Sequence, residues 1–508
     1  MKKTRIKFAI YATIALSIVP TLSFAAPLDG HQIKSELRCG SLEKSVMPAF
    51  TEDFEKINRA SYKIDFMADN FPGQVVNGTT YAHPLYGTYA LSDYINAYKH
   101  ATTNASKATY KKAVEDVAKA VICHMEVLSN GGLASYYDYP YIAPGQKKFY
   151  SALTQAQYLP FIHDAAVISQ SDAIKAAGEL IVRSLELRQD EGGVVFEDPK
   201  GNLIPEEYPG DSTHPPQFVL NGWMDVLIWL DTYYGKTKSP TAKKLLTQFG
   251  AALEHSIEKY NAPDANTSLY KLSEIGQINF LESAGGELEI KRASVAIPTV
   301  GAYPITLTKT FDDRAYKNVF FGPGSTSVDG STRLTNNANA WLWLSLYPPE
   351  GNTIELELKA VKSSKFMVRL LVGKPQMRGG GKTDYDWLPL TDQISLEAGK
   401  TISLKVPISR QIIMAATQPL TSFKPITVGN STAYVNVYHY AHISQLCRLS
   451  TVLNDERLKE KSISWEQYTE GWNDMPMYKN AGVDLRRSDV ILGIKGKIFY
   501  SCLPEQAN

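Results

Sequence analysis

The sequence predicts an α+β multidomain protein in which an α/α toroid of paired antiparallel helices is interrupted by an inserted β-sandwich. Two observations lead to this fold class. Apolar residues recur with helical spacing from about residue 85 to 262, and helical pattern returns at 438–472. Between these segments, short runs of alternating apolar and polar residues are separated by Pro- and Gly-rich turns, which is typical of strands.

Helical spacing is clearest in three apolar stripes. One stripe lies within 110–124, a second within 174–185 and a third within 245–257. The second stripe follows Ser171, a residue type that favours the N-cap of a helix. Turn-forming residues separate the helices, as expected for short connections between antiparallel partners. Further helices are expected near 85–100, 150–169, 215–234, 438–452 and 455–472.

The strand pattern is clearest where Ile354, Leu356 and Leu358 alternate with charged neighbours, which predicts a strand with one wet face. Similar runs occur at 294–309, 339–347, 365–373, 401–408 and 411–416. The predicted division of the chain is a signal peptide (1–25), the first part of the toroid domain (26–284), the inserted β-sandwich (285–428), the last helix pair (429–472) and a C-terminal tail (473–508) with a strand at 490–499.

The first 25 residues have the features of a cleavable signal peptide. Four basic residues precede a mostly apolar run from Phe8 to Leu22, and Ser23 and Ala25 place small residues where a signal peptidase cleaves. The alternative is an uncleaved anchor, but the run is shorter than the roughly 20 residues that span a bilayer. We therefore expect a periplasmic or secreted bacterial protein that does not associate with a membrane after cleavage.

The net charge and the cysteine content restrict the classes of ligand and the cellular compartment that fit this sequence. Loss of the signal peptide removes four basic residues and changes the net charge from +1 to −3, too weak a field to attract nucleic acid. The four cysteines (Cys39, Cys123, Cys447 and Cys502) permit two disulfides in an oxidising compartment, with three possible pairings. The oligomeric state cannot be predicted.

Common catalytic signatures are absent. The chain has no GxSxG, HExxH, Walker or dinucleotide-binding motif, and no CxxC pair. His439 and His442 could face one side of a helix and hold a metal ion, but no third ligand is evident. We therefore predict neither metal nor cofactor.

Two segments combine Tyr, His, Glu and Gln at places where a helix would otherwise be purely apolar. The first segment is 205–223, where a polar loop opens into a helix, and the second is 438–446. Side chains at the start of such helices can reach a central cavity. The alternative is that Tyr208 and Tyr438 are packing residues with satisfied hydroxyl groups.

These segments resemble the C-terminal helical domain of the heparan sulfate and heparosan D-glucuronyl C5-epimerases. The similar strings are Glu-Glu-Tyr-Pro at 206–209, Phe-Val-Leu-Asn-Gly at 218–222, Tyr-His-x-x-His-Ile-x-Gln-Leu at 438–446 and Ser-Ala-Leu-Thr-Gln-Ala-Gln at 151–157. The resemblance covers roughly 80–275 and 434–472. The chain departs from the family because a β-sandwich interrupts the helices and the N-terminal β domain of the animal enzymes is missing.

The resemblance implies that tyrosines act as catalytic acid and base, at Tyr208, Tyr438 and Tyr270. An Arg of the family corresponds to Ser273 here, so another group must hold the substrate carboxylate; Lys271, His214, His439 and Arg448 are the candidates. The full set of expected substrate-binding residues is Glu207, Gln155, Gln157, Asn221, His439, His442, Lys271 and Arg448.

Three functions remain open. The first is C5-epimerisation of uronic acid residues within an acidic polysaccharide, by transfer of the weakly acidic proton α to the carboxylate. The second is a uronan lyase, which begins with the same proton abstraction and then expels the 4-linked sugar. The third is a non-catalytic glycan-binding protein. Which uronate polymer is bound, and whether it is sulfated, cannot be predicted.

Overall fold

The computed structural model describes most of the chain beyond the predicted signal peptide. The described residues are 29–138, 140–141, 148–211, 215–263, 266–282, 285–305, 307, 319–321, 325–328, 330–335, 340–347, 350–373, 385–417, 423–428, 431–474 and 501–503. The predicted signal peptide, His214 and the strand predicted at 490–499 lie outside these residues.

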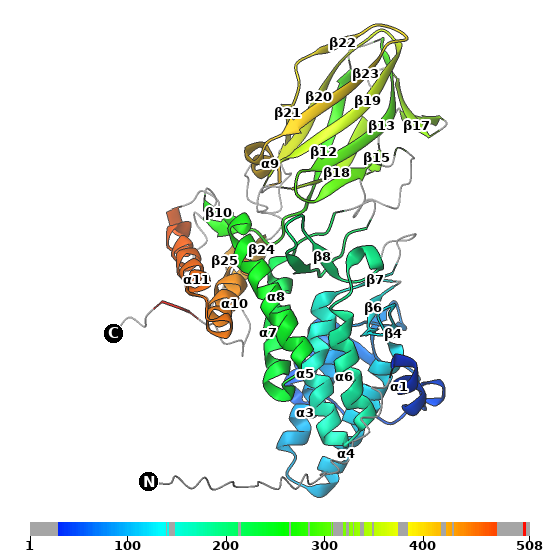
Figure 1. The fold of residues 1–508 in the computed structure, drawn as a ribbon, viewed down its shortest axis with the longest axis vertical. Coiled ribbons are helices and arrows are strands. Elements are labelled where there is room, and N and C mark those ends of the chain that lie inside the picture. Colours follow the sequence, from blue (N-terminus) through cyan, green and yellow to red (C-terminus); the bar gives the residue numbers. More distant parts are fainter. Residues whose placement is uncertain are drawn as a thin grey trace, which may run out of the picture.

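Four helix pairs form one part of the molecule (Figure 1). They are α3 (Tyr86–His100) with α4 (Asn104–His124), α5 (Ala152–Ser169) with α6 (Asp172–Ser184), α7 (Leu220–Thr237) with α8 (Pro240–Ser256), and α10 (Val437–Leu453) with α11 (Glu456–Tyr468). Helices α3, α5, α7 and α10 lie side by side in this order, and we call them the inner helices. Connections of two or three residues make the two helices of each pair antiparallel.

Three of the inner helices differ at their N-termini from the partner helices α4, α6, α8 and α11, which we call the outer helices. Each outer helix has a side-chain N-cap, provided by Thr103, Ser171, Ser239 and Asp455 for α4, α6, α8 and α11. Helices α3, α5 and α7 have no such side-chain cap. The partial positive charge of a helix N-terminus is therefore not offset by a capping side chain in these three inner helices.

Short elements surround the helices. Before α3 lie α1 (Gly30–Glu36), α2 (Glu52–Ile57) and a three-stranded sheet of β1 (Ile64–Phe66), β2 (Pro72–Val76) and β3 (Thr79–Ala82). Five two-stranded ribbons follow along the chain: β4 (Glu126–Val127) with β5 (Leu133–Ala134), β6 (Tyr136–Tyr137) with β7 (Phe149–Tyr150), β8 (Val195–Glu197) with β9 (Leu203–Pro205), β10 (Asn261–Ala262) with β11 (Thr267–Ser268), and β24 (Phe423–Val428) with β25 (Ser431–Asn436).

The strand-rich part consists of two six-stranded antiparallel sheets. The first joins β15 (Val319–Phe321), β18 (Ala340–Leu346), β12 (Glu274–Glu282), β20 (Ser364–Gly373), β21 (Tyr385–Pro389) and β22 (Ile394–Leu396). The second joins β16 (Ser325–Val328), β17 (Ser331–Thr335), β13 (Glu287–Ile297), β19 (Asn352–Lys362), β23 (Thr401–Ile408) and β14 (Gly301–Pro304). The predicted alternation is observed in β19, where Ile354, Leu356 and Leu358 are buried. The α+β class is thus confirmed, while closure into a toroid and a β-sandwich stay predictions.

The strand-rich part begins earlier than predicted, at Glu274 instead of 285. Gly276 and Asn279 hide the alternation of β12 in the sequence. A Cβ atom at Gly276 would collide with Leu346 of β18, so the glycine allows the two strands to approach closely. Asn279 is buried, but its side-chain oxygen accepts a hydrogen bond from Arg369 Nε at 3.1 Å.

The strand predicted at 411–416 is wrong, because this segment forms helix α9 (Arg410–Thr417). The Ser409 hydroxyl accepts a hydrogen bond from Ile412 N at 3.3 Å, as an N-cap does. In α9, therefore, the serine before the short apolar run indicates the helix better than the apolar content of the run does. The helix predicted at 215–234 also differs, because it begins later, at Leu220.

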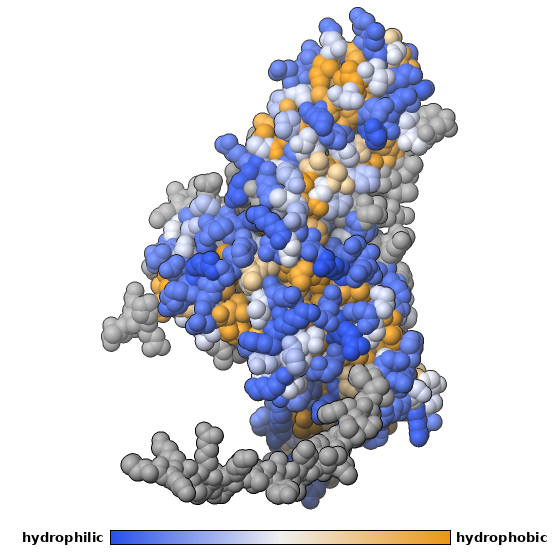
Figure 2. Space-filling view, in the orientation of Figure 1, coloured by the Kyte–Doolittle hydropathy of each residue, from blue (hydrophilic) through white to orange (hydrophobic). Residues whose placement is uncertain are grey.

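Two disulfides connect distant segments. Cys39 pairs with Cys123 and Cys447 pairs with Cys502, which selects one of the three possible pairings. No helix among the described residues is both long and apolar enough to cross a membrane. On the face shown in Figure 2, hydrophilic residues predominate and hydrophobic residues form small patches.

Candidate active site

Four segments meet at the N-terminal end of α7. The loop after β9 carries Glu207 and Tyr208, and the segment after β11 carries Tyr270. Leu220 N, the first residue of α7, donates a hydrogen bond to Tyr270 O at 2.9 Å. Tyr438 lies at the start of α10, and its ring centre is 4.2 Å from that of Tyr270. The three predicted catalytic tyrosines therefore lie in one cluster with Glu207.

Tyr270 is the centre of this cluster. Burial, then the negative charge of Glu207, the neighbouring Tyr438 and Tyr208 and a hydrogen bond between Tyr270 and Tyr438, hold the pKa of Tyr270 well above the usual value. Tyr270 therefore stays a neutral phenol at all ordinary pH values. Tyr208 is more accessible, with 36% of its surface exposed.

Glu207 has the electrostatics of a general acid or base. Burial, and then the negative charge of Asp225, raise its pKa to about 7, while a hydrogen bond from Tyr208 opposes the shift. Its Oε2 atom is buried and has no hydrogen-bond partner among the described residues. A Cβ atom at Gly222 would collide with this oxygen, so the glycine at the start of α7 makes room for the carboxylate.

Asp225 and Gln445 belong to the same site, although neither was among the predicted site residues. Gln445 Nε2 donates to Asp225 Oδ1 at 2.6 Å and to Asn221 O at 3.2 Å, which joins α10 to the first turns of α7. Asn221 Oδ1 and Gln445 Oε1 are buried acceptors without a partner among the described residues. Sugar hydroxyls can donate to acceptors of this kind, and substrate binding by Asn221 stays a prediction.

Glu206 positions the turn before α7. It is fully buried, and its Oε2 accepts a hydrogen bond from Phe218 N at 3.0 Å. Burial raises its pKa well above the usual value. Phe218 has a left-handed backbone (φ 54°), which is strained for an aromatic residue, and Tyr260 donates to its carbonyl at 2.9 Å. Glu206 and Tyr260 thus hold a strained turn beside the site.

His439 and His442, both predicted to bind substrate, lie in the protein interior. Both are fully buried, and their Nδ1 atoms lie 2.8 and 2.7 Å from the Ser268 hydroxyl. The other ring nitrogen of His439 donates to Trp465 O at 2.8 Å, and burial lowers the His439 pKa to about 4. Both histidines therefore act as neutral positioning residues that tie α10 to β11, two residues before Tyr270. No group of three or more His, Cys, Asp or Glu in the described part of the chain could hold a metal ion.

Gln155 does not line a cavity as predicted. It is fully buried, its Oε1 accepts from Ser135 N at 2.9 Å, and its Nε2 donates to Ser135 O at 2.7 Å and Ser151 O at 3.2 Å. Every hydrogen-bonding group of this amide is used by the backbone. Gln157 is half-buried on the same helix and stays a candidate for substrate binding.

We expect opposite effects from replacing these two glutamines with leucine. Gln155→Leu removes the partners of two backbone groups, Ser135 N and Ser135 O, and should lower the free energy of unfolding by about 2–4 kcal/mol. Gln157→Leu should raise KM for the substrate more than it lowers the melting temperature. Thermal denaturation and steady-state kinetics of both variants test this, and a larger loss of stability in Gln157→Leu would make Gln157 structural.

Two predicted basic groups differ in position. Lys271 pairs through its backbone with Val219, beside the start of α7. Arg448 lies ten residues after Tyr438 on α10, which places the two residues about 15 Å apart along the helix axis. Arg448 is therefore not part of the tyrosine cluster, and the prediction that it holds the substrate carboxylate is not supported.

Aromatic side chains continue from Tyr208 toward the N-terminal sheet. The Phe149 ring lies 5.8 Å from that of Tyr208 and is stacked on Tyr137 at 5.0 Å, and Tyr137 in turn contacts His83 at 5.8 Å. Sequence reasoning missed Tyr137 and Phe149, because aromatic residues in short ribbons look like ordinary core residues.

Residues 129–284 match the family described as D-glucuronyl C5-epimerase C-terminus. The matched segment contains Glu207, Tyr208 and Tyr270, and Tyr438 lies beyond it. The family resemblance predicted from the sequence is confirmed over this segment. No curated protein matches the chain.

Proposed function

We propose that this protein is an exported C5-epimerase that inverts uronic acid residues within an acidic polysaccharide. The observation that carries the proposal is the cluster of Glu207, Tyr208, Tyr270 and Tyr438, in which a carboxylate with a pKa raised to about 7 lies beside the neutral phenol of Tyr270. Inversion at carbon 5 needs one base and one acid on opposite faces of the sugar ring, and a carboxylate and a phenol are groups of these two kinds.

Glu207 is a better base than a tyrosinate in this cluster. The sequence-based mechanism paired Tyr208 with Tyr438, with Tyr270 supporting or replacing one of them, and the raised pKa of Tyr270 disfavours the tyrosinate that Tyr270 would need as a base. Glu207 accepts the proton from carbon 5, and the electron pair moves into the substrate carboxylate. Tyr270 or Tyr438 then gives a proton to carbon 5 from the other face, since the carbanion is far more basic than a phenolate. Return of the Glu207 proton to that phenolate resets the site.

The charge that develops on the substrate carboxylate must be stabilised without the arginine of the family. Ser273 stands in that place, and its backbone N donates to Gln217 O at 3.2 Å. The inner helices α3, α5 and α7 have no side-chain N-caps, and the candidate site lies at the start of α7. Helix N-termini attract anions, so the dipole of α7 supplies stabilisation here, together with a hydrogen bond from the neutral phenol of Tyr270.

Action outside the cytoplasm is part of the proposal. The two disulfide pairings support it, because disulfides persist in oxidising compartments and are rare in reducing ones. The substrate is expected to be a polymer that carries glucuronate or a related uronate, and its carboxylate is required because it acidifies the proton at carbon 5.

Proton NMR in deuterated water tests the proposal. Incubation with a panel of uronan polymers should place solvent deuterium at carbon 5 in both the product and the recovered substrate. A lyase, the alternative within enzymes, would instead form an unsaturated product that absorbs ultraviolet light. Tight polymer binding without any exchange or cleavage would indicate a glycan-binding protein and would contradict the proposal.

A further inference from the structure

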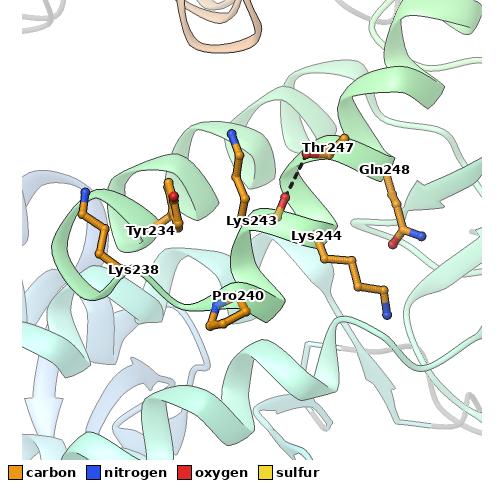
Figure 3. Close-up of a pocket in the computed structure, with 7 residues that line it drawn as sticks. All are labelled: Tyr234, Lys238, Pro240, Lys243, Lys244, Thr247 and Gln248. Carbon is orange, nitrogen blue, oxygen red and sulfur yellow. Dashed lines mark hydrogen bonds between the residues drawn. The ribbon is translucent and has the colours of Figure 1, made fainter. Parts of the chain in front are cut away.

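A basic groove lies at the end of α7 opposite to the candidate active site. It is an open hollow of about 570 Å³, within the range of roughly 300–1,000 Å³ that is usual for ligand sites. Figure 3 shows its lining, which comes from the end of α7, the turn and the start of α8. The lining residues are Tyr234, Lys238, Pro240, Lys243, Lys244, Thr247 and Gln248.

Two lysines of this groove share one aromatic ring. The ammonium nitrogens of Lys238 and Lys243 each lie 5.3 Å from the centre of the Tyr234 ring. The ring attracts both cations through its negative face, and this holds two like charges together. Both side chains are exposed, so an anion from solvent can reach them.

The neighbouring acids do not neutralise this pair. Asp164 accepts from Lys99 and Lys236, and Glu186 accepts from Lys244 at 2.9 Å. Glu179 accepts from the hydroxyls of Tyr233 and Ser239. No carboxylate among the described residues forms an ion pair with Lys238 or Lys243, and this includes Asp231, one turn before Tyr234 on α7.

The groove is distinct from the candidate active site. Tyr234 lies fourteen residues after Leu220, so the two sites are about 21 Å apart along α7. A small substrate in the active site cannot contact the groove, but a polysaccharide chain can reach both. Contact at two places raises the effective concentration of the polymer at each.

We propose that this groove is a second, non-catalytic binding site for an anionic polysaccharide, in which Lys238 and Lys243 bind carboxylates of the polymer and Tyr234 holds the two lysines in place. The inference rests on the proposed function for the identity of the polymer. A bound carboxylate offsets the repulsion between the two ammonium groups, which is the charge complementarity that selects this ligand.

The test compares Lys238→Gln/Lys243→Gln with a control pair of equal charge change, Lys107→Gln/Lys200→Gln. Lys107 is an exposed lysine over the Tyr98 ring at 5.4 Å, and Lys200 is exposed on a turn. Affinity electrophoresis measures Kd for heparosan and for heparosan whose carboxylates have been reduced to alcohols. Thermal denaturation confirms that all variants are folded.

The groove variant should bind heparosan roughly three- to tenfold more weakly than the wild type, with the difference decreasing as ionic strength rises. The control pair should change Kd less than twofold, and neither variant should change binding of the reduced polymer. Any of three results would overturn the inference. The affinity for heparosan could fall equally in both variant pairs, it could stay unchanged in the groove variant, or the wild type could fail to bind the polymer.

The two proposals fail in different ways. If no uronan shows deuterium exchange at carbon 5, the proposed epimerase function fails, while the Kd comparison still decides whether the groove binds the polymer. Normal exchange with an unchanged Kd in the groove variant would overturn the groove alone.

Discussion

Glu207→Gln is expected to slow C5 exchange by roughly 10²–10⁴-fold, the usual contribution of a positioned acid or base. Gln has nearly the same shape but cannot accept the proton. The wild type should also lose activity as pH falls through about 7, because protonated Glu207 is not a base. Deuterium incorporation measured by proton NMR between pH 5 and 9 tests both expectations.

The same substitution is expected to stabilise the protein at alkaline pH. The pKa of Glu207 is raised in the folded state, from the model-peptide value of 4.5 to about 7. Its contribution to stability is therefore fully present below pH 4.5 and is lost as pH rises through about 7. Gln does not titrate, so the variant should gain up to about 3 kcal/mol over the wild type at pH 8, and much less at pH 5.

Denaturant unfolding at pH 5 and pH 8 measures this gain. Glu460→Gln is the control, because Glu460 is exposed on α11 and should affect neither stability nor exchange. An inactive and more stable variant is the behaviour of a buried catalytic carboxylate, for which function costs stability. If the variant were active and its stability unchanged, the Glu207 carboxylate would not be a catalytic group, and burial would not destabilise its charged form in the folded protein.

The residues of the site could be predicted from the sequence only in part. Tyr208, Tyr270 and Tyr438 were identified through the family motifs, and they do lie together with Glu207. Asp225 could not be identified, because its effect on Glu207 depends on how α7 packs against the loop after β9. Contacts between segments so far apart in sequence leave no local pattern.

The histidines show a second limit of sequence reasoning. The spacing of His439 and His442 correctly predicts that both rings lie on one side of a helix. It does not tell whether that side faces a cavity or the protein interior, and here it faces Ser268 and Trp465. Gln155 was misjudged for the same reason, since a buried amide suits backbone groups as well as sugar hydroxyls.

The fold was more predictable than the site. The eight paired helices and the alternation of β19 follow from apolar periodicity, whereas the short elements before α3 and the ribbons were not predicted. Two segments of the strand-rich part show why periodicity can fail. In β12, Gly276 is needed for a close approach to Leu346, and in α9 the capping hydroxyl of Ser409 outweighs the strand propensity of the isoleucines that follow. Both exceptions depend on a single residue and not on the average character of the segment.

Removal of single hydroxyl groups should separate the roles of the three tyrosines. Of Tyr270→Phe and Tyr438→Phe, the variant that lacks the phenol returning the proton to carbon 5 is expected to slow exchange by roughly 10²–10⁴-fold, while its ring and packing remain. The other variant should be slowed much less. Tyr110→Phe, on α4 away from the cluster, is the control and should be fully active.

Tyr208→Phe is expected to act mainly on the pH profile. The Tyr208 hydroxyl donates to Glu207 and lowers its pKa, so its loss should raise that pKa above about 7 and move the acidic limb of the exchange profile to higher pH. Activity at pH 9 should stay close to that of the wild type. If Tyr208→Phe instead lost 10²-fold or more at every pH while Glu207→Gln kept its activity, the base would be the tyrosinate of Tyr208, as the family motif first suggested. Exchange profiles of the two variants under identical conditions decide between these bases.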